Sequence, residues 1–162
     1  MEKPRVLIVD DDDELRTQMK WALTSHYDVI LADDRPSALE VLKRDKPGIV
    51  TLDLGLPPSP GDTREGFLAL PVMLQMDPLP KVLVVTGQDE KENGIEAIGL
   101  GAYDFFCKPV NIDELKIVLD RAIRVQDPGN AGAGHQPRYG RRLRRPQQFV
   151  SRDGAGAVGR KA

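Results

Sequence analysis

Five short apolar runs alternate with segments of helical spacing along the first 126 residues of the chain. The runs cover residues 6–9, 29–32, 49–52, 82–85 and 103–107. Strands that alternate with helices favour right-handed crossovers and a parallel sheet. The pattern therefore predicts an α/β domain with one open sheet, in which ligands bind beyond the carboxyl ends of the strands.

The segments between the runs carry recognisable helix signals. A first helix is expected to begin near Asp13, and Asp34 is expected to cap a second. Asn111, with Glu114 three residues later, resembles a capping box for the last helix. The third helix is ambiguous, because Pro71 requires it either to start late or to kink.

Polar residues follow four of the five apolar runs. Asp10 and Asp11 follow the first run, Asp53 the third, Thr86 the fourth and Lys108 the fifth. The carboxyl ends of parallel strands lie at one edge of a sheet, so we expect all five groups to converge there.

Three carboxylates at one edge repel one another, which requires either raised pKa values or a divalent cation. Oxygen ligands without nearby Cys or His favour Mg²⁺, with Mn²⁺ as the alternative. Asp10, Asp11 and Asp53 supply carboxylates, and the backbone carbonyl of Gly55 is a fourth candidate ligand. Taken alone, the acidic stretch 10–14 is more typical of an acidic helix start than of a metal site.

The same residues suit phosphoryl transfer. Asp53 is placed to act as a nucleophile toward phosphorus and form an aspartyl phosphate. Lys108 would offset the charge of the phosphoryl oxygens, and Thr86 would donate its hydroxyl. Pro109 would fix the turn after Lys108, where a cis peptide bond is expected.

Composition and charge narrow the class. No stretch has the roughly 20 apolar residues of a membrane helix, and the start lacks a signal-peptide pattern, so a cytoplasmic protein without a membrane partner is expected. Cys107, the lone cysteine, excludes an internal disulfide and a thiolate-rich metal site.

The charge divides the chain into two parts. Residues 1–126 hold 15 basic and 23 acidic side chains, a net charge of −8, whereas residues 127–162 hold 8 and 2, a net charge of +6. The second part is rich in Gly and Arg and has few large apolar residues, so it is expected to be a disordered tail. Its basic cluster leaves open nucleic-acid binding through the tail, against the simpler interpretation of a solvated segment.

The motifs at the strand ends resemble those of the receiver domain of bacterial two-component response regulators. The matching stretches are LIVDDD (7–12), TLDLGLP (51–57), VVTG (84–87) and FFCKP (105–109). The resemblance implies a receiver domain over residues 1–126, with a flavodoxin-like, doubly wound five-stranded sheet in the order 2-1-3-4-5 and five flanking helices. It also implies that Asp53 accepts phosphate from a sensor histidine kinase or a phosphotransfer protein.

The resemblance further implies a switch and an output face. Thr86 and Phe105 match the hydroxyl and the aromatic of the family's switch, and the fourth helix, fifth strand and fifth helix match its usual homodimer face. Such a domain signals and is not an enzyme beyond slow autophosphorylation and autodephosphorylation, and the receiver itself is not expected to bind nucleic acid. The run 84–88 and the last helix resemble receivers of activators of the nitrogen-type sigma factor, acting in transcription regulation.

Two further interpretations stay open. A metal-dependent phosphatase would use the same carboxylates, but Gly55 stands where such an enzyme needs a general acid. The long Pro-rich loop 55–66 beside the predicted site is either functional or a surface insertion.

Overall fold

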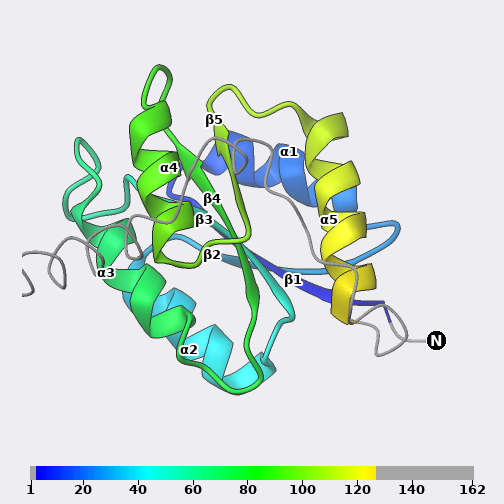
Figure 1. Cartoon of the computed structure of the whole chain (residues 1–162). Helices are drawn as coiled ribbons and strands as arrows, with labels where there is room; N and C mark the ends of the chain where they lie inside the picture. Colours follow the sequence, from blue (N-terminus) through cyan, green and yellow to red (C-terminus); the bar gives the residue numbers. More distant parts are fainter. Residues whose placement is uncertain (1–2, 127–162) are drawn as a thin grey trace, which may run out of the picture.

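The computed structural model describes residues 3–126, which form one parallel sheet covered by helices on both faces (Figure 1). The strands are β1 (Arg5–Val9), β2 (Asp28–Ala32), β3 (Ile49–Asp53), β4 (Lys81–Thr86) and β5 (Asp104–Cys107). The helices are α1 (Asp13–Leu23), α2 (Arg35–Asp45), α3 (Arg64–Met73), α4 (Lys91–Leu100) and α5 (Ile112–Gln126). The predicted basic tail, residues 127–162, lies outside the described residues.

The five strands lie in the order β2-β1-β3-β4-β5, and every neighbouring pair is parallel. The predicted α/β class and the 2-1-3-4-5 order are therefore confirmed. This order places β3, which ends in Asp53, at the centre of the sheet.

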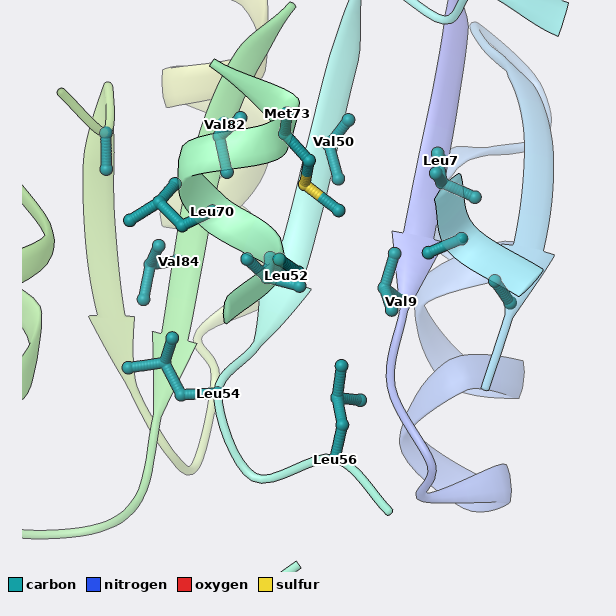
Figure 2. Close-up of a cluster of buried hydrophobic side chains, with 14 of the residues drawn as sticks. Leu7, Val9, Val50, Leu52, Leu54, Leu56, Leu70, Met73, Val82 and Val84 are labelled. Carbon is teal, nitrogen blue, oxygen red and sulfur yellow. The ribbon is translucent and has the colours of Figure 1, made fainter. Parts of the chain in front are cut away.

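The core divides into two layers because successive strand residues face opposite sides of the sheet. In β1, Leu7 and Val9 pack toward α2, α3 and α4, whereas Val6 and Ile8 pack toward α1 and α5. Figure 2 shows the first layer, where side chains of β1, β3 and β4 meet those of α3. Burial on both faces explains why the strands appear in the sequence as continuous apolar runs.

Side-chain caps begin three of the helices. The Asp12 carboxylate accepts hydrogen bonds from the backbone N–H groups of residues 14 and 15 at the start of α1. Asp34 caps α2 through the N–H of Ser37, and Asn111 caps α5 through the N–H of Glu114. The starts predicted for these helices are confirmed. Each capping side chain satisfies an N–H group of the first helical turn, which has no acceptor within the helix.

Helix α3 resolves the ambiguity left by Pro71. The helix begins at Arg64 and its first turn is closed by the bond from the N–H of Phe67 to the carbonyl of Thr63, so the late-start alternative is wrong. Pro71 stands inside the helix close to its end. There it removes only one N–H donor from a ladder that is already formed.

Gly66 lets α3 approach the segment that follows Asp53. Its N–H donates to the carbonyl of Leu54 over 3.2 Å. A Cβ atom at position 66 would lie 2.3 Å from the Cα of Leu54, closer than non-bonded atoms pack. The first turn of α3 is thereby fixed against the chain directly beyond the central strand.

We predict that Gly66→Ala destabilises the domain by about 2–3 kcal/mol, because the added methyl group must push α3 away from Leu54. Urea unfolding followed by circular dichroism measures the change. Gly61→Ala is the matched control, since a Cβ atom there meets nothing within 4 Å. Equal unfolding midpoints for the two variants would contradict the close approach.

Candidate functional site

The carboxyl ends of four strands bring the predicted site residues to one edge of the sheet. Asp53 and Thr86 are the last residues of β3 and β4, while Asp10 and Lys108 directly follow β1 and β5. A cavity of about 380 Å³ opens at this edge. Residues from the strand ends and from the loop before α3 line it together, namely Asp11, Asp53, Gly55, Pro60, Asp62, Thr86, Gly87, Glu90 and Lys108.

Asp10, Asp11 and Asp53 form a carboxylate cluster. One carboxylate oxygen from each lies within 4.8 Å of the others, with Asp10 and Asp53 buried and Asp11 exposed. These hard oxygen donors, open to solvent on one side, fit a Mg²⁺-sized cation that keeps several waters. Of the acidic stretch 10–14, Asp12 instead caps α1, so the helix-start interpretation holds for that residue.

Backbone groups orient the two buried carboxylates. Asp10 Oδ1 accepts the N–H of Asp12 at 2.9 Å, and Asp53 Oδ1 accepts the N–H of Gly55 at 3.1 Å. The side chain of Arg16 donates to the backbone carbonyl of Asp10 at 2.6 Å. Arg16 was not singled out from the sequence, where only its position in the first helix was evident.

Lys108 connects the two buried carboxylates. Its Nζ lies 3.5 Å from Asp53 Oδ2 and 3.6 Å from Asp10 Oδ2. The peptide bond from Lys108 to Pro109 is cis, as the sequence led us to expect. The ammonium therefore sits over the pair of acids, with part of its surface facing the cavity.

Burial and neighbouring charges shift the pKa values of these groups. Burial, reinforced by the charge of Asp53, raises the pKa of Asp10 from 3.8 to about 7. Burial also raises the pKa of Asp53, although Lys108 partly offsets it. Burial lowers the pKa of Lys108, but the carboxylates of Asp53 and Asp10 outweigh that effect and the net shift is upward. Near neutral pH, the acid pair therefore takes up a proton unless a further cation neutralises it.

The Thr86 hydroxyl is engaged by a residue that the sequence analysis missed. It donates to Glu90 Oε1 at 3.2 Å, and the backbone N–H of Gly87 donates to the same oxygen at 3.2 Å. Glu90 directly precedes α4. The only sign of this contact in the sequence was that Glu90, a carboxylate, lies four residues after Thr86.

Phe105 lies in the core beneath α4. Its side chain is fully buried, and a Cβ atom at Gly94 of α4 would lie 2.0 Å from its ring. The ring thus fills the space that any side chain at Gly94 would need.

The Pro-rich loop folds over Gly55. The carbonyl oxygen of Pro60 would lie 2.9 Å from a Cβ atom at Gly55, and the carbonyl of Asp62 would lie 3.7 Å from it. The loop backbone therefore fills the space that a side chain two residues beyond Asp53 would take. The structure places the loop in the wall of the cavity.

No helix among residues 3–126 combines the length and the apolar character needed to cross a bilayer.

Comparison with known proteins agrees with this geometry. The family described as response regulator receiver domain matches residues 6–120. The regulatory protein AtoC of Escherichia coli is 30% identical over 123 residues, covering 75% of this chain and 26% of AtoC. The transcriptional regulatory protein KdpE of Staphylococcus aureus is 33% identical over 130 residues, covering 78% of this chain and 54% of KdpE. The chain thus spans about a quarter to a half of these relatives.

Solved structures give the same result. The receiver domain of NtrX from Brucella abortus superposes with a TM-score of 0.67 at 31% identity, covering 75% of this chain and 99% of that domain. AtoC and NtrX-like regulators are of the sigma-54 activator type, which the sequence motifs also resemble. On this fold, these motifs and these matches, the chain belongs to the response regulator receiver domain family of two-component systems.

Proposed function

We propose that Asp53 accepts a phosphoryl group from a sensor histidine kinase or a phosphotransfer protein, and that the domain thereby switches a partner or a homodimer in transcription control. The observation that carries the proposal is the position of Lys108, whose ammonium lies 3.5 Å from Asp53 and 3.6 Å from Asp10 at the wall of an open cavity. If the ion pairs of Lys108 served only to stabilise the fold, they would gain no stability from lying beside an open cavity that a third carboxylate, that of Asp11, also lines.

The residues have distinct roles in this reaction. An oxygen of Asp53 attacks phosphorus, the bond from phosphorus to the donor's nitrogen breaks, and the donor leaves with the electron pair of that bond. The Lys108 ammonium stabilises the charge on the transferred oxygens. The hydroxyl of Thr86 then donates to the phosphoryl group, and Phe105 transmits the change to the face formed by α4, β5 and α5, the proposed homodimer surface.

Asp10, Asp11, Asp53 and the carbonyl of Gly55 are the proposed ligands of Mg²⁺, with Mn²⁺ as a substitute. When bound, the cation offsets the charge that builds up on the phosphoryl oxygens. The support is the oxygen-only cluster and the raised pKa of Asp10, which indicates a buried acid pair in want of positive charge. We further propose that the catalytic activity of the domain itself is limited to slow autophosphorylation and autodephosphorylation. The receiver domain is proposed to occupy residues 1–126 of a cytoplasmic protein.

We predict that Asp53→Asn abolishes phosphorylation by acetyl phosphate in the presence of Mg²⁺, because the amide is not a nucleophile toward phosphorus. Intact-mass spectrometry measures the gain of one phosphoryl group. Asp33→Asn is the control, since Asp33 is exposed beyond β2 and does not line the cavity. Retention of most of the mass gain in Asp53→Asn would show that another residue is the acceptor.

Lys108→Ala should slow phosphorylation by about 10²-fold, since the charge that stabilises the transferred oxygens is lost. The rate is measured by intact mass at fixed donor and Mg²⁺ concentrations. Lys116→Ala removes the same charge from an exposed position on α5 and should leave the rate unchanged. Equal rates in the two variants would exclude a role for Lys108 in the transfer.

The raised pKa of Asp10 predicts an unusual pH dependence of stability. The folded state binds a proton more tightly than the unfolded state, so the stabilisation is complete below about pH 4 and is lost as the pH rises through about 7. In EDTA, the free energy of unfolding should therefore fall between pH 5 and pH 8, by at most about 1.4 kcal/mol per pH unit for one proton.

Two comparisons isolate the cause of this decline. Asp10→Asn should flatten it, whereas Asp33→Asn should not, and Mg²⁺ should restore stability above pH 7 because it binds the deprotonated carboxylates. Urea unfolding at each pH gives the values. A stability that rises with pH in EDTA would contradict the upward shift of the Asp10 pKa.

A further inference from the structure

Glu90 places a carboxylate on two donors at the wall of the cavity. Its Oε1 accepts the hydroxyl of Thr86 and the backbone N–H of Gly87, each at 3.2 Å. All three residues line the cavity that contains Asp53 and Lys108. One oxygen of an anionic side chain thus occupies two donors that face the proposed phosphoryl site.

The backbone around Glu90 is shaped for this contact. A Cβ atom at Gly87 would lie 2.8 Å from Glu90 Oε1, so a larger residue there would displace the carboxylate. The N–H of Glu90 donates to the carbonyl of Gly87 at 3.1 Å, and Asp89 between them adopts a positive φ of 63°. This tight turn directs the Glu90 side chain back toward Thr86.

Helix α4 provides a second sign that the contact is specific. Glu90 occupies the position before the first residue of α4, but its side chain makes no capping hydrogen bond to the helix. A carboxylate at this position ordinarily gains stability by accepting an N–H of the helix's own first turn. Here the carboxylate is committed to Thr86 and Gly87 instead.

A hydroxyl donates one hydrogen bond, so the proton of Thr86 cannot serve Glu90 and a phosphoryl oxygen together. We propose that Glu90 is a positioning residue that holds the Thr86 hydroxyl and the Gly87 N–H in the free protein, and that the phosphoryl group must displace it. This inference rests on the proposed phosphorylation of Asp53. Glu90 then sets how readily phosphorylation recruits Thr86. Because Glu90 directly precedes α4, its release changes the side-chain contacts at the start of that helix.

The test compares Glu90→Ala with Glu92→Ala. Both remove one exposed carboxylate at the start of α4, but Glu92 takes no part in the hydrogen bonds to Thr86 and Gly87. In the free protein, NMR three-bond couplings report the side-chain rotamer of Thr86, and the Gly87 amide shift reports its hydrogen bond. Both should change in Glu90→Ala and stay as in wild type in Glu92→Ala.

Beryllofluoride with Mg²⁺ then serves as a stable analogue of the phosphoryl group. Removing the competing acceptor should make Glu90→Ala bind it about 3- to 10-fold more tightly than wild type, the range expected for one net hydrogen bond. Glu92→Ala should bind as wild type does. Glu90→Gln keeps an acceptor oxygen without the charge and should fall between wild type and Glu90→Ala.

The Thr86→Ala background separates positioning from simple charge repulsion. If Glu90 acts through the hydroxyl, the gain from Glu90→Ala must shrink when Thr86 is already Ala. An equal gain in both backgrounds would mean that Glu90 only repels the anion, and would overturn the proposal. So would an unchanged Thr86 rotamer and Gly87 amide in Glu90→Ala.

The outcomes distinguish this proposal from the one on which it rests. If wild-type protein with Mg²⁺ binds no beryllofluoride, the proposed function fails and the role of Glu90 falls with it. If wild type binds the analogue but Glu90→Ala and Glu92→Ala match it, only the role of Glu90 is overturned. Glu90 is exposed, so loss of fold is not expected, and the amide spectrum of each variant checks this.

Discussion

The site depends on two carboxylates, Asp10 and Asp53, that are buried together with one ammonium, Lys108, between them. Burial is the main cause that raises the pKa of both acids, the charge of Asp53 adds to it at Asp10, and the single ammonium of Lys108 offsets it only in part.

Strand register holds this unfavourable pair in place. Val9 of β1 pairs with Leu52 of β3, so the next residue on each strand brings Asp10 beside Asp53. A slip of one residue would turn Asp53 to the other face of the sheet and bury an apolar side chain at the site. Because both faces of the sheet are covered by helices, such a slip would disrupt both core layers at once. The packing energy of the whole domain therefore opposes relaxation of the acid pair.

The features predictable from the sequence are those set by near neighbours in the chain. Apolar runs gave the strands, side chains such as Asp34 and Asn111 gave the helix starts, and the order of elements placed the polar strand ends at one edge. The features that were missed depend on tertiary approach. The start of α3 depends on Gly66 fitting against Leu54. The path of the loop over Gly55 depends on the position of Pro60, and no periodic pattern of residues in the loop predicts that path. Glu90 was missed because its partner lies across a turn that only the backbone geometry defines.

The two residues of the proposed switch, Thr86 and Phe105, are held in place by different interactions. Phe105 carries no hydroxyl, so its full burial against Gly94 leaves no donor unpaired and is stabilised by apolar contact alone. Thr86, by contrast, has one proton and an anionic acceptor already in place in Glu90. Phosphorylation of Asp53 must therefore break the hydrogen bond between Thr86 and Glu90. The Phe105 ring makes no such bond through its side chain, so its movement is limited only by how closely α4 packs against it. On the proposed role of Glu90, one carboxylate at the start of α4 has to yield to another anion before Thr86 can respond.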